Sequence, residues 1–173
     1  MDRLLLGFDA RVVQNGNQIS VDAQGSPSAF DVLHLDRPDW TGPVQRLWED
    51  RYALEAVIAA QQDRLGEDGR LMLIAIAVLV DSCSPSRVEW MERVTPTRPR
   101  EVGEQWSFLG FDVADAYLES ATTMLTGLPA GDLRLNELGL INDLDGARQL
   151  REAAMRAYPD QNPFCIYEIW EVR

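Results

Sequence analysis

The 173-residue sequence contains no lysine, only one histidine and only two cysteines. Without lysine, the chain cannot form a Schiff base and cannot build the nuclease site that combines carboxylates with a lysine. One histidine, without any Cys-x-x-Cys pair, excludes the common zinc sites. The glycine-rich phosphate-binding patterns Gly-x-x-x-x-Gly-Lys and Gly-x-Gly-x-x-Gly are also absent. This inventory points away from enzymes that use these groups, and we expect no cofactor.

The chain does have a large excess of acidic residues. Asp and Glu number 28 and the basic residues, all of them Arg, number 16, which gives a formal net charge of -12 at pH 7. This charge opposes binding to nucleic acid and to an anionic membrane surface. It favours fast association with a basic protein, although the same charge also serves solubility. We therefore expect a basic protein as partner, with no nucleic acid and no membrane.

Apolar runs and cysteines bear on the location of the protein. The first residues, 1–7, carry an acid at the second position and only a short apolar run, so we expect no signal peptide. The longest apolar run, 71–80, has ten residues, where a membrane-spanning helix needs about 20. Two isolated cysteines, Cys83 and Cys165, are typical of buried, reduced thiols. We expect one globular domain over residues 1–173, located in the cytoplasm.

Hydrophobic periodicity predicts the secondary structure. Alternation on both sides of Asn15-Gly16 predicts a β-hairpin over 3–23. The run 71–80 is apolar on both faces and therefore predicts a central, covered strand. Further strands are predicted at 30–35, 88–94, 106–112 and 164–172, and helices at 43–65, 115–127 and 142–158. This order predicts an α+β fold with a mixed, mostly antiparallel sheet packed by two or three helices.

Two groups of residues suggest chemistry, and each has a structural alternative. Cys83 follows a buried strand and His34 lies near the end of another, so the two could form a nucleophile and its base. The alternative is a small residue in a loop and a hydrogen-bonded strand histidine. Asp112 and Asp115, with Glu119, could hold Mg²⁺, or could mark a helix start, where carboxylates are favoured. A small enzyme that uses either group is the alternative function, and we assign no catalytic or metal-binding residue.

Tryptophans beside carboxylates predict a surface for protein contacts. Trp side chains are common binding hot spots and make cation–π contacts with basic partners. Trp40 lies in a predicted turn, and Trp170 lies between two glutamates that point to opposite faces of a strand. The predicted partner-binding residues are Trp40, Asp112, Asp115, Glu119, Glu168, Trp170 and Glu171.

Three stretches carry a resemblance to known proteins. They are Trp-Ser-Phe-Leu-Gly-Phe-Asp-Val-Ala-Asp at 106–115, Leu-Asn-Glu-Leu-Gly-Leu-Ile at 135–141 and Pro-Phe-Cys-Ile-Tyr at 163–167. The chain resembles a family of uncharacterised bacterial proteins with FLGYDVAD, LNEYGL and PFFVY stretches, and such short acidic proteins resemble the immunity proteins of bacterial polymorphic toxin systems. One departure is at 118–125, which is not rich in Gly, Ser, Asn and Cys as it is in that family.

The resemblance implies a protein that binds a toxin from the same cell and blocks it. Together with the charge, it predicts an acidic cytoplasmic immunity protein that occludes the active site of a cognate basic toxin. The mechanism needs no cofactor and no bond is made or broken. A different class, a module that self-associates through a sheet edge, stays open beside it.

Overall fold

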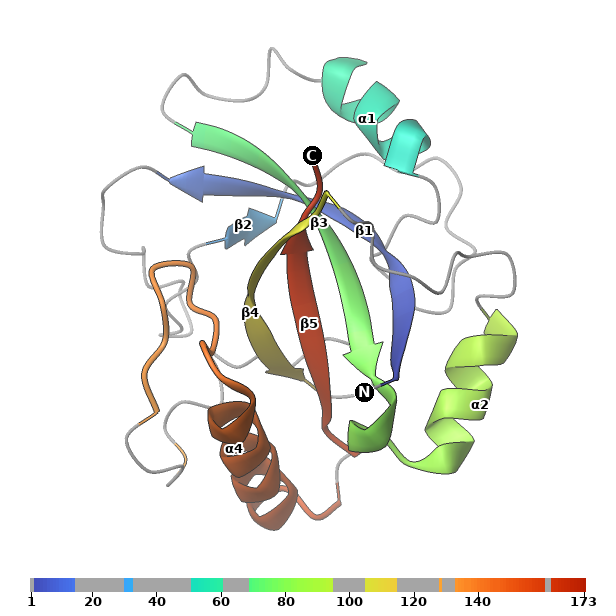
Figure 1. Cartoon of the computed structure of the whole chain (residues 1–173), viewed down its shortest axis with the longest axis vertical. Helices are drawn as coiled ribbons and strands as arrows, with labels where there is room; N and C mark the ends of the chain where they lie inside the picture. Colours follow the sequence, from blue (N-terminus) through green and yellow to red (C-terminus); the bar gives the residue numbers. More distant parts are fainter. Residues whose placement is uncertain are drawn as a thin grey trace.

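The computed structural model describes residues 2–14, 30–32, 51–60, 69–94, 105–114, 128, 133–160 and 163–173. Its elements, in chain order, are β1 (Arg3–Gln14), β2 (Phe30–Val32), α1 (Arg51–Ala60), β3 (Gly69–Leu79), the 3-10 turn η2 (Val80–Ser82), α2 (Pro85–Val94), β4 (Ser107–Ala114), α4 (Leu144–Ala157) and β5 (Cys165–Glu171). The strands form one sheet in the order β2-β1-β3-β5-β4 (Figure 1). All four neighbouring pairs are antiparallel, so the predicted α+β class is confirmed.

Strand β3 lies in the middle of the sheet because both of its faces are apolar. Ile74, Ile76 and Val78 are buried on one face, whereas Ala75 and Leu79 are buried on the other. Strand β1 pairs with β3 along its whole length on one side, and β5 pairs with β3 on the other. The prediction of a central strand at 71–80 is therefore confirmed.

Helices pack on both faces of this sheet. Helix α2 contributes Met91 to the core on the face of Ile74 and Ile76. On the opposite face, α1 buries Leu54 near one end of the sheet. Helix α4 covers the other end of that face with the buried residues Ala147, Leu150, Ala153 and Ala154. Figure 1 shows α1 at one end of the sheet and both α2 and α4 near the end where β3 finishes.

Residues 85–94 form a helix, so the strand predicted at 88–94 is wrong. Pro85 occupies the first helical position, where its missing N–H costs nothing. The backbone oxygen of Ser84 accepts hydrogen bonds from the amides of Arg87 and Val88 at 2.9 and 3.1 Å, which closes the first turn. The predicted alternation skipped Met91, which the helix buries completely.

The other predicted elements agree with the described residues or lie outside them. The N-cap of helix α4 is Asp143, one residue later than the predicted cap at 142, because the Asp143 side chain accepts the hydrogen bond from the Gly146 amide at 2.8 Å. Helix α1 falls within the predicted 43–65, and β5 within 164–172. The predicted hairpin partner at 19–23 and the predicted helix at 115–127 lie outside the described residues, and the described neighbours of β1 are β2 and β3.

Candidate functional site

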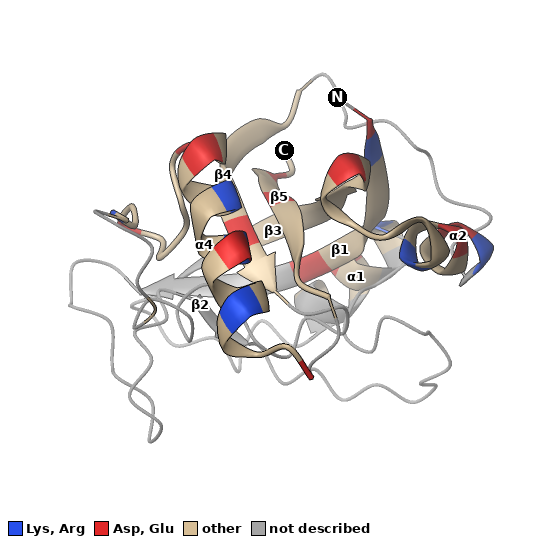
Figure 2. Ribbon diagram, turned by 90° about the horizontal axis from the view of Figure 1, so that it is seen from below, with Lys and Arg blue, Asp and Glu red and all other residues tan. Residues whose placement is uncertain are grey.

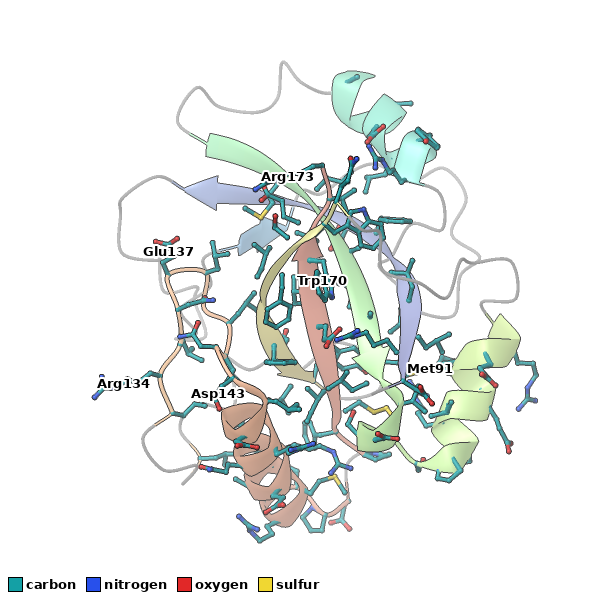
Figure 3. All side chains as sticks on the ribbon, viewed as in Figure 1. Met91, Arg134, Glu137, Asp143, Trp170 and Arg173 are labelled. Atoms are coloured by element: carbon teal, nitrogen blue, oxygen red, sulfur yellow. A yellow bond between two sulfur atoms is a disulfide. The ribbon has the colours of Figure 1, made fainter. Side chains whose placement is uncertain are left out.

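Four of the predicted partner-binding residues lie on two neighbouring strands. Asp112 belongs to β4, and Glu168, Trp170 and Glu171 belong to β5. Antiparallel pairing of these strands places Trp170 directly opposite Phe108. Figure 3 shows the Trp170 side chain on β5, near the middle of the sheet. The remaining predicted residues, Trp40, Asp115 and Glu119, lie outside the described residues, as does His34.

Glu168 is buried and bound within the protein. Only 3% of the residue is exposed. Its Oε2 atom is 2.5 Å from Nε of Arg3 and also accepts a hydrogen bond from the Trp170 indole at 3.3 Å. The Arg3 guanidinium lies 5.8 Å from the centre of the Trp170 ring, so one arginine contacts both side chains. Glu168 therefore positions Trp170 and Arg3 on the same face of the sheet and presents no free carboxylate at the surface.

Trp170 is part of an aromatic cluster with Phe108 and Phe111. The Phe108 ring centre lies 5.0 Å from that of Trp170 and 4.9 Å from that of Phe111, both in edge-on geometry. Phe108 is 40% exposed, although Phe111 is buried. An exposed ring supported by two others is a rigid apolar contact. The sequence alone does not indicate Phe108, because only the strand pairing places it beside Trp170.

The acidic residues near this cluster are partly exposed. The Glu171 side chain is 14% exposed and lies 3.7 Å from the Arg173 guanidinium. Glu171 pairs with Ser107 across the strands, one position from the Phe108–Trp170 pair. Asp112 lies farther along β4, opposite Tyr167, and is also half-buried. Asp112 and Glu171 each lie one position from a member of the cluster along their strands, so their side chains point to the opposite face of the sheet and do not border the cluster.

The three stretches that carry the resemblance form one structural unit. Residues 107–114 pair with β5, and Phe111 exchanges two backbone hydrogen bonds of 2.8 Å with Ile141. The Asn136 side chain donates to the Leu109 carbonyl at 2.9 Å, and its oxygen accepts from the amides of Leu138 and Leu140 at 2.9 and 3.0 Å. Asn136 therefore folds the 136–140 turn and ties it to β4.

Gly110 allows the close approach of this turn. Its φ of +150° lies in the region that disfavours residues with a side chain. A Cβ atom at this position would lie 2.7 Å from Cβ of Leu140 and 3.0 Å from the carbonyl oxygen of Ile141. The glycine of the first stretch is thus required by its close contact with the second stretch. Gly110 and Asn136, which belong to the stretches that carry the resemblance, therefore have structural roles in this part of the fold.

Cys83 and Cys165 form a disulfide, so the expectation of two reduced thiols is wrong. Their Cα atoms are 5.2 Å apart, although 82 positions separate them in the sequence. The preceding residue makes a second link, because the Ser82 hydroxyl accepts a hydrogen bond from the Ile166 amide at 2.8 Å and donates to the Leu79 carbonyl at 2.7 Å. In this oxidised form Cys83 has no thiolate to act as a nucleophile.

Within the described ranges, no three His, Cys, Asp or Glu side chains are grouped so that they could hold a metal ion. No helix in that part of the chain is both long and apolar enough to cross a membrane. Figure 2 shows acidic and basic residues interspersed on α2 and α4. The described surface is therefore of mixed charge on both of these helices.

Comparisons of the chain with protein-family models, with curated proteins and with solved structures find no match. The fold itself defines the class: an α+β domain with an antiparallel sheet and helices on both faces. The resemblance of residues 106–115, 135–141 and 163–167 to an immunity-related family stays a prediction.

Proposed function

We propose that this chain is an acidic binding protein of the immunity type, which neutralises a cognate basic toxin by occluding its active site. The observation that carries the proposal is the net charge of -12. The described residues contain 15 Asp and Glu against 11 Arg, so two thirds of the surplus belongs to the rest of the chain. A protein with this charge attracts a cationic protein over several ångströms before contact.

The aromatic cluster of Phe108, Phe111 and Trp170 is the proposed centre of the docking face. Exposed aromatic rings on a rigid strand bury area at a low cost in side-chain entropy. Glu171 points to the opposite face of the sheet and is not part of this docking face. Glu168 lies beside Trp170 on the same face of the sheet, and its bonds to Arg3 and Trp170 fix the indole orientation.

To occlude the active site of the toxin, the protein needs only to bind it, and electrostatic attraction sets the rate of binding. Charge complementarity raises the association rate at low ionic strength, whereas the buried aromatic contacts determine the dissociation rate. Salt should therefore slow binding strongly and affect dissociation little. The proposal therefore predicts an association rate that falls strongly with salt and a dissociation rate that changes little.

The test measures binding to candidate toxins encoded by the neighbouring genes. Association and dissociation rates are recorded by surface plasmon resonance at about 0.05 M and about 0.5 M salt, where screening differs several-fold. Phe108→Ala should weaken binding by about tenfold or more, as expected for a hot spot. The matched control is Tyr52→Ala, which removes an aromatic ring on α1 that is 72% exposed.

Each outcome bears on a different part of the proposal. The absence of a complex at low salt would refute the immunity function. A complex whose association rate ignores salt would refute the electrostatic part. If Phe108→Ala and Tyr52→Ala weakened binding equally, the aromatic cluster would not be the docking face.

The location of the protein has its own test. The sequence predicts a cytoplasmic protein, whereas the Cys83–Cys165 disulfide is typical of an oxidising compartment. Rapid alkylation of thiols in intact cells, followed by mass spectrometry, distinguishes the two. Alkylated cysteines would support the cytoplasmic proposal, and an intact bridge would refute it.

A further inference from the structure

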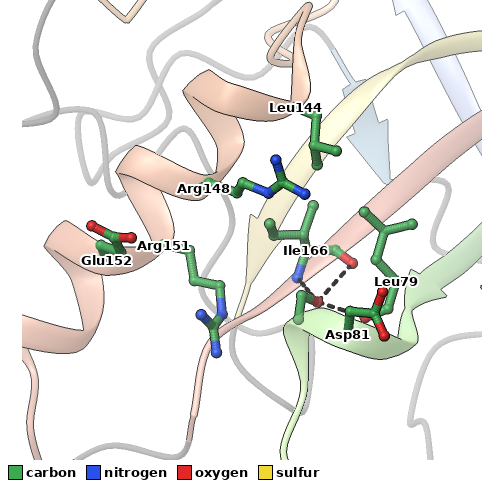
Figure 4. Close-up of a pocket in the computed structure, with 8 residues that line it drawn as sticks. Leu79, Asp81, Leu144, Arg148, Arg151, Glu152 and Ile166 are labelled. Carbon is green, nitrogen blue, oxygen red and sulfur yellow. Dashed lines mark hydrogen bonds between the residues drawn. The ribbon is translucent and has the colours of Figure 1, made fainter. Parts of the chain in front are cut away.

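A pocket lies between α4, the start of β5 and the turn η2. It encloses about 240 Å³ and is shown in close-up in Figure 4. Leu79 and Ile166, both almost fully buried, provide an apolar surface inside it. Ser82 also lines the pocket, but its hydroxyl is already bonded to Leu79 and Ile166. The volume is below the range of about 300–1,000 Å³ typical of drug-sized ligands, so the pocket fits a small molecule.

Two arginines of α4 line one wall of the pocket. Arg148 and Arg151 lie three positions apart, and so on the same side of the helix. Nε of Arg151 donates a hydrogen bond of 2.8 Å to the Phe164 carbonyl, which orients the guanidinium. Figure 4 shows both guanidinium groups extending from α4 toward the strand side, whereas the Glu152 carboxylate points away. Oriented guanidinium groups are suited to bind a carboxylate through paired hydrogen bonds.

Asp81 of η2 lines the pocket on the side opposite to these arginines. Among the described residues, neither Arg148 nor Arg151 forms an ion pair with it; Arg148 instead pairs with Asp145 at 3.3 Å. Opposite charges therefore face each other across a cavity that has an apolar surface between them. This arrangement has room for a molecule that carries a charge of each sign.

We propose that the pocket binds a short zwitterion whose carboxylate and ammonium groups lie at opposite ends of an apolar chain. Arg148 and Arg151 bind the carboxylate, Asp81 binds the ammonium group, and the methylene groups lie on Leu79 and Ile166. The site is distinct from the aromatic cluster on β4 and β5, and the inference does not depend on the proposed function. An ω-amino acid has this chemistry.

The test compares three probes of the same chain length at constant ionic strength. They are 5-aminopentanoate, pentanoate, which lacks the ammonium group, and pentylamine, which lacks the carboxylate. Binding is followed by chemical-shift changes in ¹H–¹⁵N spectra of the full chain. The zwitterion should bind about tenfold more tightly than either single-charge probe, because each lost charged hydrogen bond costs about that factor. The shifts should map to α4 and η2.

Two variants separate the two ends of the ligand. Arg148→Gln should weaken binding of 5-aminopentanoate and pentanoate alike by about tenfold, whereas Asp81→Asn should weaken binding of 5-aminopentanoate and pentylamine and leave pentanoate unchanged. Both side chains are exposed, so neither substitution removes a core contact. Arg93→Gln and Glu89→Gln, at exposed positions of α2 away from the pocket, are the matched controls and should change nothing.

Three results would overturn the proposal. Equal affinity for pentanoate and 5-aminopentanoate would make this a simple anion site. Equal losses in the pocket variants and the α2 controls would show a general charge effect. No shift changes with any probe at about 10 mM would show that the pocket takes no such ligand.

Discussion

Reduction of the Cys83–Cys165 disulfide should lower the free energy of unfolding by about 4.5 kcal/mol at 25 °C. The bridge joins residues 82 positions apart, and a closed loop of this length restricts the unfolded chain by about that amount in the chain-entropy model. For a chain of 150–250 residues, each kcal/mol corresponds to about 2–4 °C in the melting temperature. The expected decrease is therefore about 9–18 °C.

The reduced protein should still fold. The Ser82 hydroxyl joins the same two segments through its hydrogen bonds to Ile166 and Leu79, and these bonds do not depend on the sulfur atoms. Cys165 is fully buried, and a reduced thiol is well tolerated in an apolar core. The far-ultraviolet circular dichroism spectrum should therefore be the same with and without reductant.

The assay is urea unfolding, followed by tryptophan fluorescence, with and without a phosphine reductant. A Cys83→Ala/Cys165→Ala double variant is the control. It should be about as unstable as the reduced wild-type protein and should not respond to the reductant. A change of less than about 1 kcal/mol in the wild-type protein would refute the reasoning. A response of the double variant would show that the reductant acts elsewhere.

Three further predictions concern substitutions near the edge strand β4 and around the buried carboxylate of Glu168. Each is checked by urea unfolding. Gly110→Ala should cost about 3 kcal/mol, because its Cβ would overlap Leu140 and its φ is unfavourable; a cost below about 1 kcal/mol would contradict this. Asn136→Ala should cost about 2–3 kcal/mol for three lost hydrogen bonds, and an unchanged midpoint would exclude that role. Arg3→Ala should cost about 1–3 kcal/mol, and adding Glu168→Gln should restore part of this loss by removing the buried charge; no recovery would argue against the ion pair.

Strands were predictable where apolar residues repeat over a long stretch. The run at 71–80 is apolar on both faces, and only the centre of a covered sheet buries both faces of a strand. The stretches at 106–112 and 164–172 were similarly clear, and they became β4 and β5. The fold class followed from these strands, because their order along the chain favours antiparallel pairing.

The segment 85–94 shows where short patterns fail. Val88, Trp90 and Val94 fit an alternating strand, but Val88 and Met91 also fit one face of a helix. Pro85 after Ser84 favours the helix, since proline suits the first helical position. The burial of Met91 against the sheet decides between them, and burial is a property of the tertiary structure.

The candidate site was only partly predictable. Trp170 and Glu171 were predicted from their neighbours in sequence and stay predictions, whereas the burial of Glu168 depends on Arg3, which lies at the other end of the chain. The disulfide likewise depends on the register of β3 and β5, in which Val78 pairs with Tyr167 and brings Cys83 to Cys165. Such contacts are set by strand pairing, and spacing along the sequence does not reveal them.

Among the described strands, β4 lies at one edge of the sheet, and an edge strand normally leaves backbone groups open to another chain. Here Phe111 has both its amide and its carbonyl bonded to Ile141, and the Leu109 carbonyl is bonded to Asn136. A second copy of the chain would have to displace this turn before one of its strands could pair with β4. We therefore expect this turn to hinder edge-to-edge association, and its removal should make a concentrated solution turbid.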